Sequence, residues 1–92
     1  MDQLEARPKR LSHVKARPQE QQLSLFNTQT AEFFVLNSTG RFVWEACDGT
    51  NTVGGIVEKL IEACATPPER SEVVRDVGVL VEEMKDKGLV RW

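Results

Sequence analysis

The chain has 92 residues, 28% of them charged, and a formal net charge of −2 at neutral pH. A chain of this length forms one domain with a modest core, and no apolar run in it reaches the roughly 20 residues that span a bilayer. Residues 1–18 contain five basic and two acidic residues, whereas residues 19–92 contain seven basic and twelve acidic residues. An acidic main part argues against a surface for nucleic acid.

Residues 1–13 lack hydrophobic periodicity, so we expect them to form a flexible basic tail before a domain over residues 14–92. The start of the chain is charged and has no apolar stretch, unlike a secretory signal, and we therefore expect a cytoplasmic protein. Cys47 and Cys64 fall on apolar helix faces, where a free cysteine usually behaves as a small buried hydrophobe. Two cysteines and the distant His13 do not make a metal site.

The first structured segments are predicted to be short strands. Residues 14–17 indicate a first strand, which Pro18 is expected to end. Leu23 and Leu25 alternate with polar neighbours, as in a half-buried strand. Residues 27–30 are typical of a turn and predict that a hairpin partner follows.

The segment Glu32–Leu36 is rich in strand-forming residues and is the expected hairpin partner. Its alternation places Phe34 and Leu36 on one face and Phe33 and Val35 on the other. Because Leu36 leads directly into a predicted helix, we expect the Phe34 face to be the core face.

Two short helices joined by a tight turn are expected next. Asn37 or Ser38 can cap the first helix, Gly49 can end it in a left-handed conformation, and Thr52 can cap the second. One face of the first helix is formed by Gly40, Val43, Trp44 and Cys47. The apolar stripe of the second is formed by Val53, Ile56, Val57, Leu60, Ile61 and Cys64.

A third helix is expected over residues 69–87, before Gly88. Its inward stripe is predicted to be Val73, Val77, Leu80 and Met84. Val74 and Val81 widen this stripe beyond what a small core needs. Two interpretations remain open: a wide core face, or an apolar groove for a partner that leaves both valines exposed in the free protein.

No catalytic constellation is visible in the sequence, which has one histidine and no tyrosine. The glycine spacing does not make a phosphate loop. Acidic and basic residues alternate near the end of the third helix, as on a solvated face. We therefore expect no enzyme activity, no cofactor and no bound metal, and a small enzyme or enzyme fragment is an unsupported hypothesis.

The ordered combination of several short motifs resembles the PqqD family, whose members are peptide-binding modules also called RiPP recognition elements. The residues that carry the resemblance are Leu36, Asn37, Thr39, Gly40, Val43, Trp44, Asp48, Gly49, Thr52, Val53, Ile56, Leu60, Asp76, Val77, Leu80, Met84, Gly88 and Leu89. It covers roughly residues 7–92, although the family more often has polar residues at Gly54 and Gly55. The resemblance implies an α+β, winged-helix-like fold in which an N-terminal three-stranded antiparallel sheet is followed by three α-helices.

The same resemblance implies a function and its partners. The module would bind the leader region of a ribosomally synthesised precursor peptide as a strand added to residues 32–36, and present it to a modifying enzyme. The family resemblance points to a radical SAM enzyme, in RiPP or pyrroloquinoline quinone (PQQ) biosynthesis; no nucleic acid and no membrane are expected as partners. The expected peptide-binding residues are Phe33, Phe34, Val35, Leu36, Val74, Arg75, Gly78, Val81 and Glu82.

The alternative is a winged-helix DNA-binding protein, because the expected topology is close to that class. A recognition helix needs basic residues along one face to meet phosphates. In the second helix Lys59 stands beside Glu58 and Glu62, and residues 69–87 carry four basic and six acidic residues. This charge pattern makes DNA binding the weaker hypothesis.

Overall fold

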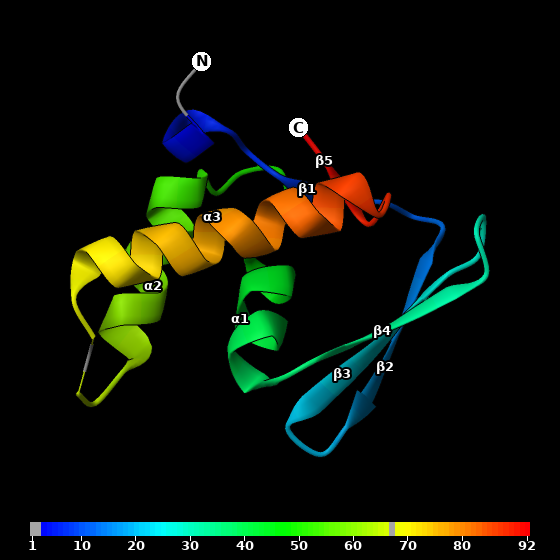
Figure 1. Ribbon diagram of the computed structural model, residues 1–92, viewed down its shortest axis with the longest axis horizontal. Helices are drawn as coiled ribbons and strands as arrows, with labels where there is room; N and C mark the ends of the chain where they lie inside the picture. Colours follow the sequence, from blue (N-terminus) through cyan, green and yellow to red (C-terminus); the bar gives the residue numbers. More distant parts are fainter. Residues whose placement is uncertain (1–2, 67) are drawn as a thin grey trace.

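The computed structural model describes residues 3–66 and 68–92 and has an α+β fold, with a three-stranded antiparallel sheet and three α-helices (Figure 1). The fold class predicted from the sequence is therefore confirmed. Within the described residues, no helix is long and apolar enough to cross a membrane. The elements are η1 (Gln3–Glu5), β1 (Lys9–Arg10), β2 (Val14–Gln19), β3 (Gln22–Asn27), β4 (Glu32–Leu36), α1 (Ser38–Ala46), α2 (Val53–Ala63), α3 (Arg70–Asp86) and β5 (Val90–Arg91).

The three-stranded sheet has the order β2-β3-β4, so β3 is central and β2 and β4 each have one free edge. In its antiparallel register, Leu25 of β3 lies opposite Ala16 of β2 and Phe34 of β4. Leu25 is buried and Phe34 is half-buried, whereas Phe33 and Val35 are 72% and 61% exposed. The alternation predicted for β4 is confirmed, with one set of side chains facing the core and the other facing away.

Strand β2 is longer than the sequence predicted. It continues through Pro18 to Gln19, and Glu20 then adopts a left-handed φ of 59° in the turn to β3. Proline is tolerated here because β2 is an edge strand, in which a residue can lack its N–H without breaking a ladder on both sides. The expectation that Pro18 ends this strand is therefore wrong.

Side-chain caps set the starts of α1 and α2. The Oδ1 atom of Asn37 accepts a hydrogen bond from the backbone N–H of Gly40 at 2.8 Å, so Asn37 rather than Ser38 caps α1. The Oγ1 atom of Thr52 accepts one from Gly55 at 3.0 Å and caps α2, as predicted. Both caps satisfy N–H groups that the first helical turn leaves without an intrahelical partner.

The core lies between the inner face of the sheet and the helices, with α3 packed across α2 (Figure 1). At the end of α3, Gly88 has a φ of 71°, and Leu89 returns to the core. The buried Asn27 donates from Nδ2 to the carbonyl of Lys87 at 2.9 Å, which ties the end of β3 to the end of α3. The buried core includes Leu25, Val43, Trp44, Ile56, Val57, Val77, Val81 and Met84.

The N-terminal segment differs from the sequence-based expectation of a flexible tail over residues 1–13. Residues 1–2 lie outside the described part of the chain, but residues 3–13 pack on the rest of the domain. Ala6 and Pro8 are buried, and β1 pairs antiparallel with β5 in a second small sheet. The expectation is therefore wrong for residues 3–13.

Backbone hydrogen bonds explain why a segment without periodicity is ordered. The carbonyl of Ala6 accepts from Val53 at 2.9 Å, and that of Pro8 accepts from Gly49 at 3.0 Å. A Cβ atom at Gly54 would lie 3.4 Å from the carbonyl oxygen of Leu4, an ordinary van der Waals contact, so η1 lies close to the first turn of α2.

Candidate functional site

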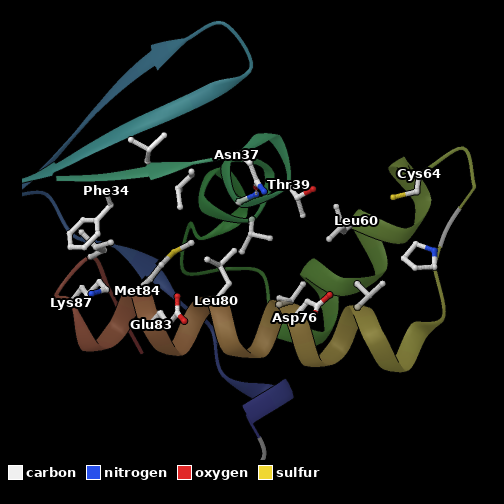
Figure 2. Close-up of a pocket in the computed structure, with 18 of the residues that line it drawn as sticks. Phe34, Asn37, Thr39, Leu60, Cys64, Asp76, Leu80, Glu83, Met84 and Lys87 are labelled. Atoms are coloured by element: carbon white, nitrogen blue, oxygen red, sulfur yellow. Dashed lines mark hydrogen bonds between the residues drawn. The ribbon is translucent and has the colours of Figure 1, made fainter.

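An open groove of about 830 Å³ lies between β4 and α3, a volume within the range typical of ligand sites (Figure 2). Strand β4 borders it along Phe33, Phe34, Val35 and Leu36. Helix α3 forms the opposite wall, and the C-terminal part of α2 closes one end. The apolar side chains of this groove outside β4 are Val43, Leu60, Cys64, Pro68, Val73, Val77, Leu80, Met84 and Leu89.

The free edge of β4 is unprotected. Alternate residues of an edge strand direct their N–H and C=O groups away from the neighbouring strand, where another strand can pair with them. The other edge strand, β2, carries Lys15, Arg17 and Pro18, which are typical of edges that resist pairing. Strand β4, with the sequence Glu-Phe-Phe-Val-Leu, has none of these residue types. The sheet therefore presents one edge suited to pairing, and that edge borders the groove.

Charged and polar side chains surround the apolar groove. The ammonium of Lys87 lies 5.0 Å from the ring centroid of Phe34, a cation–π distance, at one end (Figure 2). Asp76 lies further along α3, and Glu83 lies between it and Lys87. Asn37 and other polar groups of the α1 start complete the rim. The groove thus combines an apolar interior with opposite charges at separate points of its rim.

The two cysteines have different environments. The Cys47 thiol is buried and donates to the carbonyl of Val43 at 3.1 Å. Burial raises the pKa of this thiol from 9.0 to about 12, so it is protonated at neutral pH and is a poor nucleophile. Cys64 is half-buried at the α2 end of the groove (Figure 2). In the described part of the chain, no three His, Cys, Asp or Glu residues are grouped to hold a metal ion.

The turn between α1 and α2 is held by the carboxylate of Asp48. The side-chain hydroxyl of Thr50 donates to Oδ1 at 2.7 Å, its backbone N–H at 2.9 Å, and that of Asn51 at 3.2 Å. These bonds, that of the Thr50 hydroxyl first, lower the pKa of Asp48 to about 2. This ionised carboxylate has a structural explanation and lies outside the groove.

The sequence-predicted site residues fall in three places. The four residues Phe33 to Leu36 line the groove. The α3 residues Val74, Arg75, Gly78 and Glu82 instead line a shallower depression on the other flank of the helix, beside Gln3. Val81 is 0% exposed and belongs to the core. Of the two interpretations left open for the wide apolar stripe, the one that leaves Val81 exposed in the free protein is therefore wrong, and Val81 belongs to a wide core face.

The physical reason is the rotation of α3 about its axis. Its buried arc runs through Val73, Val77, Val81 and Met84, and it includes Gly78 because η1 lies over that side. Leu80, predicted to face inward, is half-buried and turns toward the groove instead. Because the N-terminal segment with η1 covers one flank of α3, residues on that flank are buried as well.

Several groove residues that the sequence analysis did not assign to the binding site are on α3 and α2. Asp76, Leu80, Glu83 and Lys87 follow helical spacing along one stripe, but the same pattern describes a solvated face. Only the position of the β4 edge opposite them marks the stripe as part of a site. Leu60 and Cys64 were predicted to be core residues and instead border the open end.

Comparison with known proteins identifies a matching family and two structures of similar fold. Residues 22–90 match the family model described as coenzyme PQQ synthesis protein D (PqqD). No curated protein matches the chain in sequence. Two solved structures, both described as complexes with a leader peptide, are similar in fold. "TbiB1 in Complex with the TbiA(beta) Leader Peptide" has a TM-score of 0.79 at 20% identity and covers 90% of this chain and 94% of that chain.

"Lasso peptide synthetase B1 complexed with the leader peptide" also has a TM-score of 0.79, at 17% identity, and covers 95% of this chain and 100% of that chain. At these identities the likeness concerns the fold. The family match extends from β3 through α3 to β5 and so includes the strand and the helix that form the groove. By this match over most of its length, the chain belongs to the PqqD family.

Proposed function

We propose that the groove binds the leader region of a ribosomally synthesised precursor peptide and that the module presents this peptide to a modifying enzyme. The observation that carries the proposal is the unprotected β4 edge beside an apolar groove. Two structures with the same fold are described as leader-peptide complexes, which supports it. For the modifying enzyme we propose a radical SAM enzyme, as the family resemblance implies.

The mode of binding is addition of a strand to β4. The five residues of β4 can pair with about five residues of an extended peptide, a length of roughly 17 Å. Backbone hydrogen bonds then supply affinity that does not depend on sequence, while pockets for alternate side chains supply selectivity. Every second peptide side chain faces the groove beside Phe34 and Leu80. Apolar residues at those peptide positions are favoured because they bury the open groove wall.

Helix α3 is proposed to contact the peptide through the stripe of residues that faces β4. This stripe consists of Asp76, Leu80, Glu83 and Lys87. Val74, Arg75, Gly78 and Glu82 lie on the opposite flank and are not adjacent to this strand position. Lys87 suits an acidic peptide residue near the start of β4, and Asp76 suits a basic one toward α2. The separation of these charges orients the peptide in the groove.

Neighbouring residues of α3 provide a matched test. Leu80 faces the groove, whereas Val79 is 54% exposed on the other flank. Calorimetric titration would use a synthetic leader peptide of the precursor encoded beside this chain. We expect Leu80→Ser to weaken binding by about tenfold or more, because apolar contact is lost at the centre of the groove. Val79→Ser should bind within about twofold of the parent; equal effects of both changes would exclude the groove.

Hydrogen exchange tests strand addition separately from side-chain contacts, because the free edge of β2 serves as a control for the free edge of β4. On peptide binding, the β4 amides that point away from β3 should exchange more slowly, since they gain a partner. The outward amides of β2 should keep their exchange rates. Alkylation of Cys64 should slow in the same samples because this thiol borders the groove. Unchanged β4 exchange with saturating peptide would rule out strand addition.

A further inference from the structure

The sheet has a second functional candidate on its outer face, the side opposite the core. The strand register places Lys15, Phe26 and Phe33 in one row across it and Arg17, Ser24 and Val35 in the next. Below, "outer face" means these six positions. They alternate with the residues that point to the core, such as Leu25 and Phe34, so they occupy the side away from it.

The centre of the outer face is apolar and open. Phe33 and Val35 are two of the three large hydrophobic side chains that are exposed among the described residues. The rings of Phe26 and Phe33 pack against each other, with centroids 4.8 Å apart. An apolar cluster exposed on a small domain is typical of a surface that a partner covers.

The charge of the outer face is opposite to that of the whole chain. Its two charged residues, Lys15 and Arg17, are both basic and exposed, although the chain carries −2 overall with 14 acidic residues. In the part of the chain that the structure describes, neither takes part in an ion pair. Two unpaired cations beside an apolar cluster favour a partner surface with carboxylates around an apolar centre.

We propose that the outer face docks the enzyme that modifies the bound peptide, through an acidic enzyme surface with an apolar centre. This inference rests on the proposed function, because a module that presents a peptide needs a contact for the enzyme in addition to the groove. All four residues from Phe33 to Leu36 border the groove, but Phe34 and Leu36 are on the core side of β4, whereas the side chains of Phe33 and Val35 are mostly exposed on the other side. Peptide and enzyme can therefore be bound at the same time.

Strand addition also makes the docking surface depend on the peptide. A strand added to β4 continues the sheet, so alternate peptide side chains lie beside Phe33 and Val35 on the outer face. The enzyme then contacts module and peptide together and binds the loaded module more tightly than the empty one. By linkage, the enzyme raises the affinity of the module for the peptide by the same factor.

The test separates docking from peptide binding. The probes are the purified modifying enzyme encoded beside this chain and the synthetic leader peptide. Module affinity for the enzyme, with and without peptide, is measured by biolayer interferometry for the parent and for Lys15→Glu/Arg17→Glu. The matched control is Lys59→Glu/Arg91→Glu, which changes the same charge at two exposed positions outside the three-stranded sheet.

We expect the outer-face double variant to lose about tenfold or more in enzyme affinity and to bind the peptide within about twofold of the parent. The control variant should keep both affinities, and peptide should raise enzyme affinity for the parent. Enzyme affinity unchanged by Lys15→Glu/Arg17→Glu and by Phe26→Thr would overturn the proposal. So would a dimer in sedimentation velocity that Phe26→Thr dissolves, since the outer face would then contact a second copy.

The proposed function fails by a different result. If the parent module does not bind the peptide in calorimetry, the groove proposal is wrong whatever the enzyme does. If the parent module binds the peptide and the outer-face variants bind the enzyme as tightly as the parent does, only the docking inference is wrong. The charge variants alter exposed side chains, so loss of folding does not confuse these outcomes.

Discussion

The two flanks of α3 differ in what lies opposite them. The groove flank, Asp76, Leu80, Glu83 and Lys87, faces the free edge of β4 across an open groove. The covered flank, Val74, Gly78 and Glu82, faces the N-terminal segment of the same chain. One helix thus uses one flank for folding and leaves the other available for a ligand.

Contacts of Gln3 show how the covered flank is occupied. Its side-chain amide donates to the carbonyl of Gly78 at 3.1 Å and to Oε1 of Glu82 at 3.2 Å. A Cβ atom at Gly78 would lie 2.9 Å from Oε1 of Gln3, so the glycine allows this close approach. An apolar helix flank is therefore evidence of a partner only after the chain's own segments have been placed.

The largest effect is expected from uncovering the covered flank. Deletion of residues 1–8 removes the buried Ala6 and Pro8 and the hydrogen bonds to Val53 and Gly49. The free energy of unfolding should fall by about 3 kcal/mol, because apolar burial and satisfied backbone groups are lost together. Urea denaturation measures the loss. A midpoint equal to that of the parent would mean that the N-terminal segment does not stabilise the domain.

The second prediction compares two valines on α3 that differ in burial. Val81 is fully buried, so Val81→Ser should cost about 2–3 kcal/mol by leaving a cavity and burying a hydroxyl. Val74 is half-buried on the covered flank, and Val74→Ser should cost less than about 1 kcal/mol. Thermal melts of both variants measure the difference. Equal losses would contradict the rotation of α3 described above.

The buried thiol of Cys47 is expected to make the stability of the domain depend on pH. Cys47 keeps its proton in the native state up to a pKa of about 12, whereas in the unfolded chain it ionises from 9.0. The native state therefore binds more protons between these values, and stability falls with rising pH by at most about 1.4 kcal/mol per unit.

Urea midpoints at about pH 8 and about pH 10 test this pH dependence. Cys47→Ala should remove part of the alkaline loss, because the group that must ionise on unfolding is gone. Gln21→Ala, at an exposed position without an ionisable group, is the control and should retain the loss seen in the parent. If both variants lose stability at high pH equally, burial of Cys47 does not control the alkaline behaviour.

The smallest effect is expected for the polar contact across the covered flank. Gln3→Ala removes two hydrogen bonds to α3 and should cost about 0.5–1 kcal/mol. Gln21→Ala, at an exposed position between β2 and β3, is the control and should be neutral. Chemical denaturation under identical conditions compares them. A neutral Gln3→Ala would show that packing alone holds the segment.

Local chemistry made much of the fold predictable. The cap residues Asn37 and Thr52 act on groups within a few residues of themselves. Gly49 has the predicted left-handed φ of 83°, although α1 already ends at its C-cap Cys47. The alternation in β4 follows from the two-residue period of a strand and separated Phe33 from Phe34 correctly. The sequence by itself therefore determined the three strands of the larger sheet, the three helices, most of their ends and the strand half of the candidate site, but not the small sheet of β1 and β5.

The helix half of the site was decided only by the tertiary structure. Helical periodicity specifies an apolar arc, but which residues at the margins of that arc are buried depends on the segments packed against it. Here residues 3–8 cover one margin and the β4 edge leaves the other open, and both come from distant parts of the chain. Val81 was predicted as a peptide-binding residue and Leu80 as a core residue, whereas the structure buries Val81 and places Leu80 at the groove, because contacts between distant segments, not local pattern, set the environment of α3.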